Sequence, residues 1–302
     1  MTEVLLRDVS LRDGLQLTGK PLPTGRKLAL VRSLLAAGVP ELEIGSLARG
    51  DLVPPLADTL DVVAALTPEE LERCWVWVAT PRHVQKAVAA GARNVQYCFS
   101  VSDAHNNANI GRDTETSLAA MPEAVEHALG AGGRIQLCLA TSFTCPFDGP
   151  VDPDRVLEIV GDPRTAGSCD VVVCDTLGQA VPSEVGSLVG RVVAAAGDRR
   201  VAFHGHDTWG QGVANGLAAV AAGATLLAET HRDGFAITAA ERDDGGSGLA
   251  TPIFDHSGAV TAALTISGPT MRLTRDLCEQ HVDLLVNAAD RLTRTLGGRP
   301  PA

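Results

Sequence analysis

Two short polar segments, far apart in this chain of 302 residues, carry side chains that could bind one metal ion together. Arg12 and Asp13 follow an apolar run near the N-terminus, and His204 and His206 close another apolar run. A carboxylate and two imidazoles at strand ends can converge on one divalent cation and leave positions open for a substrate. Such a cation can acidify a substrate hydroxyl, which helps to break the neighbouring carbon–carbon bond.

Each candidate residue also has a structural interpretation. Asp13 could cap a loop or a helix through its carboxylate, and the two histidines could be interior residues whose neighbours satisfy them. Glu43 could be a structural strand carboxylate, and Cys145 could be a packing residue or a reactive thiol. The combination of Asp13 with two histidines on another strand favours the metal site.

The elements that must position these residues follow from a repeated pattern. Eight short apolar runs occupy residues 4–10, 42–46, 75–79, 95–101, 135–141, 171–175, 201–206 and 225–229. Helical patterns separate them, at residues 26–37, 82–90, 115–129, 183–195 and 211–222. Glycines at 38, 91 and 223 suit helix C-termini. The alternation predicts the α/β class and a (β/α)8 TIM barrel. A dinucleotide-binding fold would be expected to have a GxGxxG motif after the first run, and this chain has none there.

In such a barrel, chemistry takes place where strands end and loops begin. Arg12 and Asp13 follow the first run, and Glu43 lies on the second. Asp175 ends the sixth run, and the histidine pair closes the seventh. The candidate side chains therefore gather at one rim.

Composition and charge argue against several classes of protein. Apolar residues make up 45% of the chain and aromatic residues only 3%, so Ala, Val and Leu must build the interior. The net charge of -11 argues against a nucleic-acid partner. The seven cysteines form no CxxC pair, which favours reduced buried thiols. No run is long enough to span a membrane and no signal segment is evident, so we expect a cytoplasmic location.

The repeated pattern stops after the eighth run. Two apolar runs at 249–254 and 259–267, joined by an Asp/Ser/Gly loop, predict a β-hairpin. An amphipathic helix is predicted over residues 275–296. Its apolar face is expected to contain Leu277, Leu284, Leu285, Ala288, Leu292 and Leu296. We therefore expect a TIM barrel in which this hairpin and helix replace the usual eighth helix and lid. The new helix could cover the apolar strip left bare there.

Five segments together resemble 3-hydroxy-3-methylglutaryl-CoA lyase, one of the metallolyase barrels that also include isopropylmalate and homocitrate synthases. The segments are RDGLQ at 12–16, Glu43, SFTCPFDG at 142–149, DTLG at 175–178 and HGHDTWGQ at 204–211. They occur in order within residues 4–228, and RDGLQ favours the lyase branch. The resemblance implies Mg²⁺ or Mn²⁺ as the cofactor, bound by Asp13, His204 and His206.

The same resemblance implies a substrate and a set of catalytic roles. The substrate partner would be an acyl-CoA thioester, either 3-hydroxy-3-methylglutaryl-CoA or a related 3-hydroxyacyl-CoA. Retro-Claisen cleavage of the former would release acetyl-CoA and acetoacetate. Arg12 would stabilise the enolate oxygen, and Glu43 and Asp175 would orient ligands or relay protons. Gln16 would contribute to binding of the cofactor.

The chain departs from this family after the eighth run. The family has a catalytic cysteine on a glycine-rich loop and an asparagine that completes the metal site. Here no cysteine lies between Cys174 and Cys278, and no asparagine lies between Asn215 and Asn287. Glu229, His231 or water could replace the missing ligand.

The C-terminal segment has a resemblance of its own. RDGFA at 232–236, ATPIFDHSGAV at 250–260, ALTISGP at 263–269 and RLT at 272–274 are similar to the end of the effector-binding domain of an IclR-type regulator. The similarity covers residues 231–297, without the DNA-binding part. We interpret the chain as a fusion of a metallolyase barrel, residues 1–230, and a regulator fragment, residues 231–302.

Three functions remain open from the sequence. The leading one is a metal-dependent carbon–carbon lyase. The alternatives are a Claisen-type condensing enzyme of the same superfamily and an inactive or regulatory fusion protein with an effector-binding tail. We expect neither nucleic acid nor membrane as a partner, and a homodimer is an open alternative to a monomer.

Overall fold

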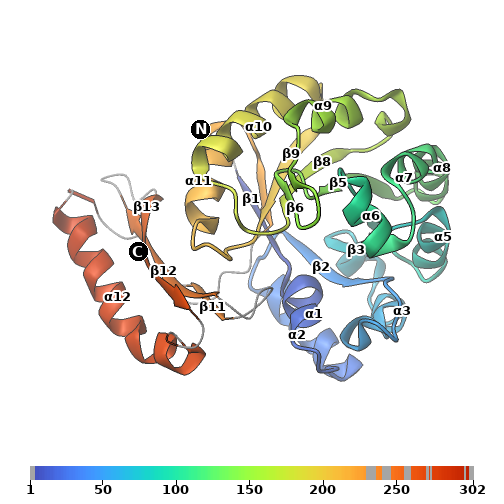
Figure 1. Cartoon of the computed structure of the whole chain (residues 1–302). Coiled ribbons are helices and arrows are strands. Elements are labelled where there is room, and N and C mark those ends of the chain that lie inside the picture. The colour runs from blue at the N-terminus through green and yellow to red at the C-terminus, as the bar shows by residue number, and fades with distance from the viewer. Residues whose placement is uncertain are drawn as a thin grey trace.

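Eight parallel strands form a closed barrel in the computed structural model of the chain (Figure 1). Their order around the barrel is β1-β10-β9-β8-β5-β4-β3-β2. The strands are β1 (Leu5–Asp8), β2 (Glu41–Ser46), β3 (Cys74–Val78), β4 (Asn94–Ser100), β5 (Arg134–Ala140), β8 (Asp170–Asp175), β9 (Arg200–Gly205) and β10 (Leu226–Ala228). Every predicted run coincides with one of them, so the predicted TIM barrel is confirmed.

The structure describes most of the chain. The described residues are 4–228, 236–239, 246–254, 260–269, 272, 274–295 and 297–298. Among them, no helix is both long and apolar enough to cross a membrane.

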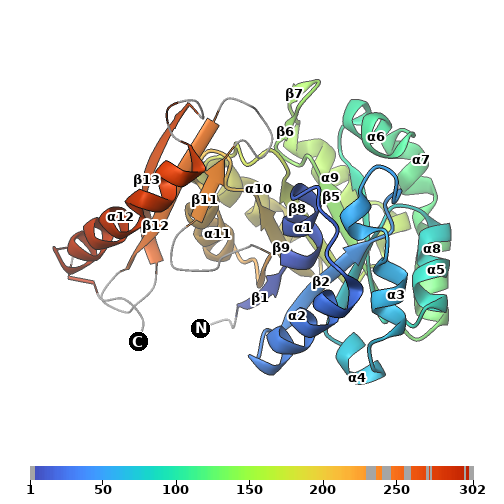
Figure 2. The same cartoon turned by 90° about the horizontal axis from the view of Figure 1, so that it is seen from below.

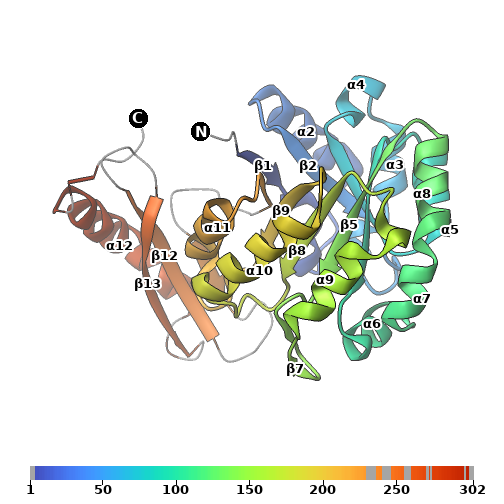
Figure 3. The same cartoon turned by 90° about the horizontal axis from the view of Figure 1, so that it is seen from above.

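Helices surround the barrel on its outer side, as Figures 2 and 3 show from two directions. The main ones are α2 (Thr24–Ala36), α3 (Thr59–Ala64), α5 (Pro81–Ala89), α6 (Asp103–Ile110), α7 (Thr114–Ala119), α8 (Met121–Gly130), α9 (Pro153–Gly161), α10 (Pro182–Ala195) and α11 (Gly212–Ala221). The helix predicted over 115–129 is in fact two helices, α7 and α8. Pro122 explains the break. Its backbone nitrogen has no hydrogen to donate, and its ring clashes with the preceding turn of a helix.

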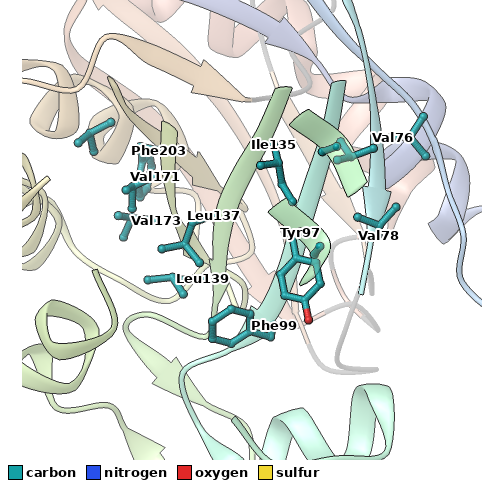
Figure 4. Close-up of a cluster of buried hydrophobic side chains, with 14 of the residues drawn as sticks. Val76, Val78, Tyr97, Phe99, Ile135, Leu137, Leu139, Val171, Val173 and Phe203 are labelled. Carbon is teal, nitrogen blue, oxygen red and sulfur yellow. The ribbon is translucent and has the colours of Figure 1, made fainter. Parts of the chain in front are cut away.

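The strands separate two apolar layers, because successive side chains of a strand point to opposite faces. Outward side chains such as Val76, Tyr97, Leu137, Val173 and Phe203 belong to the large core shared with the helices (Figure 4). A smaller cluster contains strand residues only, and it therefore fills the barrel interior. It includes Cys98, Cys138, Ala140, Val172, Cys174, Ala202 and Leu226.

The C-terminal part forms a separate antiparallel sheet. Its strands are β11 (Ala236–Ala239), β12 (Gly246–Phe254) and β13 (Val260–Pro269), in that order. Phe254 pairs with Val260, which confirms the predicted hairpin, and β11 adds a third strand that was not predicted. The last helix, α12 (Arg275–Thr295), packs against this sheet.

The position of α12 corrects one expectation from the sequence. The sheet lies between α12 and α11 (Figures 1 and 2), so α12 does not cover the barrel where an eighth helix would pack. Leu6 on β1 is accordingly 59% exposed. The predicted apolar face of α12 is also partly wrong, because Leu285 is buried whereas the neighbouring Leu284 is 60% exposed.

Candidate active site

Asp13, His204 and His206 form a compact group at the carboxyl ends of the barrel strands. Asp13 lies in a π-helical turn (Ser10–Gly14) after β1, and the histidines lie at the end of β9 and just beyond it. The Asp13 Oδ2 atom is 3.7 Å from Nε2 of His204 and 3.3 Å from Nε2 of His206. Two metal–ligand bonds of roughly 2.1 Å at a right angle separate their ligand atoms by about 3.0 Å. The spacing and the donor types therefore suit one divalent cation.

The surroundings of His204 prepare its ring for such a role. The Nδ1 atom lies 3.1 Å from the carbonyl oxygen of Ala228. A ring nitrogen that donates to a carbonyl carries the proton, so Nε2 keeps its lone pair toward Asp13. Burial is the largest influence on the pKa of His204 and lowers it, although Asp13 acts in the opposite direction. The neutral imidazole that metal binding requires is thus favoured.

Arg12 lies between the carboxylates of Asp13 and Glu43. Its Nε donates to Glu43 Oε2 at 2.6 Å, and its Nη1 donates to Asp13 Oδ1 at 2.8 Å. Burial alone would lower the pKa of Arg12, but Glu43 and Asp13 outweigh it and the pKa is raised. Burial would likewise raise the pKa of Glu43, yet Arg12 and Arg7 lower it. Both groups are therefore charged.

A cavity of about 330 Å³ opens over these residues. Arg12, Asp13, Gln16, His204 and His206 all line it, so five predicted site residues meet there. Further lining residues include Trp77, Gln96, Cys98, His105, Cys138, Cys174, Thr176 and Thr208. A larger hollow of about 460 Å³ lies at the opposite end of β8 and β9, and none of the predicted site residues lines it.

The other two predicted catalytic residues lie behind the cavity wall. Glu43 is 1% exposed and holds Arg12. The carboxylate of Asp175 accepts the backbone N–H groups of Gln179 at 3.2 Å and Ala180 at 3.0 Å. Burial raises the pKa of Asp175 against these hydrogen bonds. In this arrangement Asp175 shapes the loop that carries Thr176.

Several lining residues were not predicted from the sequence. Gln96, Cys98, Cys138 and Cys174 lie on strands with their side chains inward, so the two-residue period of each strand could have indicated them. His105 lies on α6 and had no comparable signal. Cys145 is buried, and its sulfur accepts the N–H groups of residues 147 and 148 at 3.4 Å, which fits its packing interpretation.

Comparison with known proteins places this barrel in a family. Residues 3–231 match the HMGL-like family. The chain is 34% identical to the (R)-citramalyl-CoA lyase of Chloroflexus aurantiacus over 229 residues, which is 72% of each protein. Its fold is similar to that of the HMG-CoA lyase from Brucella melitensis, with a TM-score of 0.71, 28% identity, and coverage of 76% of this chain and 81% of the other.

A second solved structure is also similar. It is an HMG-CoA lyase from Acinetobacter baumannii in complex with coenzyme A and 3-methylmalate, with a TM-score of 0.71 and 25% identity. The alignment covers 100% of this chain and 93% of the other. From the family match and the 34% identity to the Chloroflexus lyase, the chain belongs to the HMGL-like family and is a lyase-type enzyme.

Proposed function

We propose that the protein is a divalent-metal-dependent lyase that cleaves a carbon–carbon bond in 3-hydroxy-3-methylglutaryl-CoA or a related 3-hydroxyacyl-CoA. The observation that carries this proposal is the Asp13, His204 and His206 group beside Arg12 in one cavity. Mg²⁺ or Mn²⁺ would be held by the three ligands, in keeping with their mixed oxygen and nitrogen donors. When bound, such a cation polarises the oxygen atoms of the substrate.

The protein's own side chains supply the remaining steps. Arg12 keeps its charge and is fixed by Glu43, so its guanidinium is prepared to stabilise the negative oxygen of a thioester enolate. Glu43 acts here as a positioning residue. Gln16 lines the same cavity and would hydrogen-bond the bound ligand. Asp175 would maintain the loop around Thr176.

The size of the cavity supports an acyl-CoA substrate bound at one end only. A volume of about 330 Å³ is at the lower end of small-molecule pockets, so the acyl group would enter while most of coenzyme A stays outside. The similar lyase from A. baumannii was solved with coenzyme A and 3-methylmalate. (R)-Citramalyl-CoA is the second substrate to consider, because the Chloroflexus relative is named for it.

The test is release of acetyl-CoA from each of the two acyl-CoA substrates by the purified chain with Mg²⁺ or Mn²⁺. We expect turnover of at least one substrate, and loss of turnover in Arg12→Ala. The variant His127→Phe on the outer surface of α8 serves as the control. A folded, metal-binding chain that cleaves neither substrate would contradict the proposal. A chain that only forms acyl-CoA products from acetyl-CoA would favour the Claisen-type alternative.

We further propose that residues 231–302 are a fragment of an effector-binding domain of the IclR type, joined to a barrel of residues 1–230. The support is a sheet and helix with a small core of their own, which contains Leu249, Cys278 and Leu285. Glu229 and His231, the predicted substitutes for a missing metal ligand, lie outside the described residues. The homodimer and the cytoplasmic location stay predictions.

A further inference from the structure

His105 is an imidazole that lines the cavity and has no role in the proposed function as described so far. It lies in the first turn of α6, and its backbone N–H donates to the N-cap hydroxyl of Ser102 at 3.3 Å. Its Nδ1 lies 2.6 Å from the hydroxyl oxygen of Ser100, a residue with no exposed surface. The Ser100 N–H in turn donates to Asn106 Oδ1 at 2.8 Å. The ring of Phe147 lies 6.2 Å away, between centroids. The imidazole is thus held in one place at the cavity wall.

We propose that His105 is the proton donor of the lyase reaction, delivering a proton to the carbon atom left by bond cleavage. The assignment rests on the proposed function. With Nδ1 engaged by Ser100, Nε2 is the nitrogen that would carry the transferred proton. Ser100 is then a positioning residue that orients the ring.

The proton and electron balance of the step is simple. A base takes the proton of the substrate hydroxyl, which becomes a carbonyl as the carbon–carbon bond breaks. The electron pair of that bond moves to the carbon next to the thioester and forms an enolate. The His105 imidazolium then gives its Nε2 proton to this carbon, completing a methyl group and leaving a neutral ring. The ring recovers a proton from the base or from solvent, and no oxidant or reductant is needed.

The position of His105 suits this carbon atom. In the proposed function, the hydroxyl and carboxylate end of the acyl group would face the Asp13 group, and the thioester would point to the mouth, with coenzyme A outside. Figures 2 and 3 show α6 and the hairpin β6 (Thr144–Cys145) and β7 (Gly149–Pro150) at the same end of the barrel. His105 follows the carboxyl end of β4 and lines the cavity, with Phe147 of that hairpin beside it.

Three thiols on the cavity floor are the competing proton source. The sulfur atoms of Cys138 and Cys174 are 3.5 Å apart. A hydrogen bond to Cys138 and burial raise the pKa of Cys98, and a hydrogen bond to Cys174 and burial raise the pKa of Cys138. A thiol that gave up its proton here would leave a buried thiolate, which desolvation disfavours. An imidazolium that donates becomes neutral instead, so the chemistry favours His105.

The experiment uses two readouts of the full chain with Mg²⁺. One readout is cleavage of the acyl-CoA substrate. The other is exchange of deuterium from D₂O into the methyl group of acetyl-CoA, which is measured by mass spectrometry. In His105→Phe we expect both rates to fall by roughly 10²–10⁴-fold, which is the usual contribution of a general acid or base. The metal-induced rise in melting temperature should be unchanged. Free imidazole should partly restore exchange in His105→Ala, which a purely structural role would not predict.

The controls separate the two levels of the proposal. His127→Phe, on the surface of α8, should exchange and cleave at the rate of the unaltered protein. If the unaltered protein neither cleaves nor exchanges, the proposed function fails and the role of His105 fails with it. If it does both and His105→Phe exchanges equally fast, only the role of His105 is refuted. Loss of exchange in Cys138→Ala but not in His105→Phe would assign the proton to the thiols and also refute it. Should His105→Phe not fold, His105→Gln replaces it.

Discussion

At the rim, the side chains of the proposed metal ligands are held by charged neighbours. Asp13 offers Oδ2 to the two histidines while its Oδ1 accepts from Arg12. The guanidinium therefore orients the carboxylate without occupying the oxygen nearest the histidines. Removal of one ligand should disrupt this group more than removal of a surface residue.

We expect His206→Ala to lose the metal-induced stabilisation. A ligand that binds only the folded state at about 100 times its dissociation constant adds roughly 2.7 kcal/mol to the free energy of unfolding. Thermal melting with and without Mn²⁺ measures this difference. The unaltered protein and His127→Ala should both melt at a higher temperature with Mn²⁺. An equal shift in His206→Ala would show that the cation binds elsewhere.

Glu43→Gln tests the positioning of Arg12. The amide keeps the shape of the side chain but loses the charge that holds the guanidinium, whose Nε donates to Glu43 at 2.6 Å. We expect kcat of the proposed lyase reaction to fall by about 10²–10³-fold, comparable to the loss of one donor to a developing negative oxygen. The Mn²⁺-induced melting shift should persist, because Glu43 does not line the cavity. Unchanged kcat would remove Glu43 from the mechanism.

At the scale of the elements, loops and caps place the site while strands provide its frame. The π-helical turn after β1 presents Arg12 and Asp13, and the loop after β8 is held by Asp175. For α12, the amphipathic pattern predicted the helix correctly but assigned an exposed leucine to its buried face. Its sequence contains two adjacent leucines, and packing against the β12 sheet buries only one of them.

Two neighbouring substitutions test the packing of α12. Leu285→Ala should destabilise the sheet and helix by about 2–5 kcal/mol, since it removes a buried side chain. Leu284→Ala should change stability by no more than about 0.5 kcal/mol, because this side chain is mostly exposed. Hydrogen exchange of the α12 amides measures both. Faster exchange in Leu284→Ala than in Leu285→Ala would reverse the assigned face.

At the scale of the whole molecule, a buried ionic network joins the amino ends of the strands. Arg7 donates to Glu41, with its Nε at 3.0 Å, and to Gln136 at 2.7 Å. Arg200 donates to Glu41 at 3.0 Å and to Asp170 at 2.9 Å. The five residues come from five different strands. The network thereby closes the barrel at the end opposite the site.

Asp170→Asn should destabilise the whole barrel at neutral pH, by about 3–5 kcal/mol, because it breaks a buried ion pair. Burial alone would raise the pKa of Asp170, but Arg200, Gln136 and Arg7 lower it below its ordinary value of 3.8. A carboxylate with a lowered pKa stabilises the fold above its unfolded pKa and loses this effect as the pH falls through its folded value. The difference between Asp170→Asn and the unaltered protein, measured by urea unfolding, should therefore shrink below pH 3.8. A constant difference would show that charge is not the cause.

The sequence by itself determined the eight strands and the hairpin, and it indicated the three residues of the candidate metal group. These depend on the alternation of apolar runs and helical patterns, on turn residues and on motifs at strand ends. All three can be recognised from the order of residues in the chain. Only the tertiary structure decided which side chains come together and which remain exposed. Closure of β1 against β10 brings Asp13 to His204 and leaves Leu6 exposed. Packing of α6 beside β4 adds His105 to the cavity lining. The sequence did not indicate this, because the lining of a cavity depends on elements that are distant in sequence and follow no shared period.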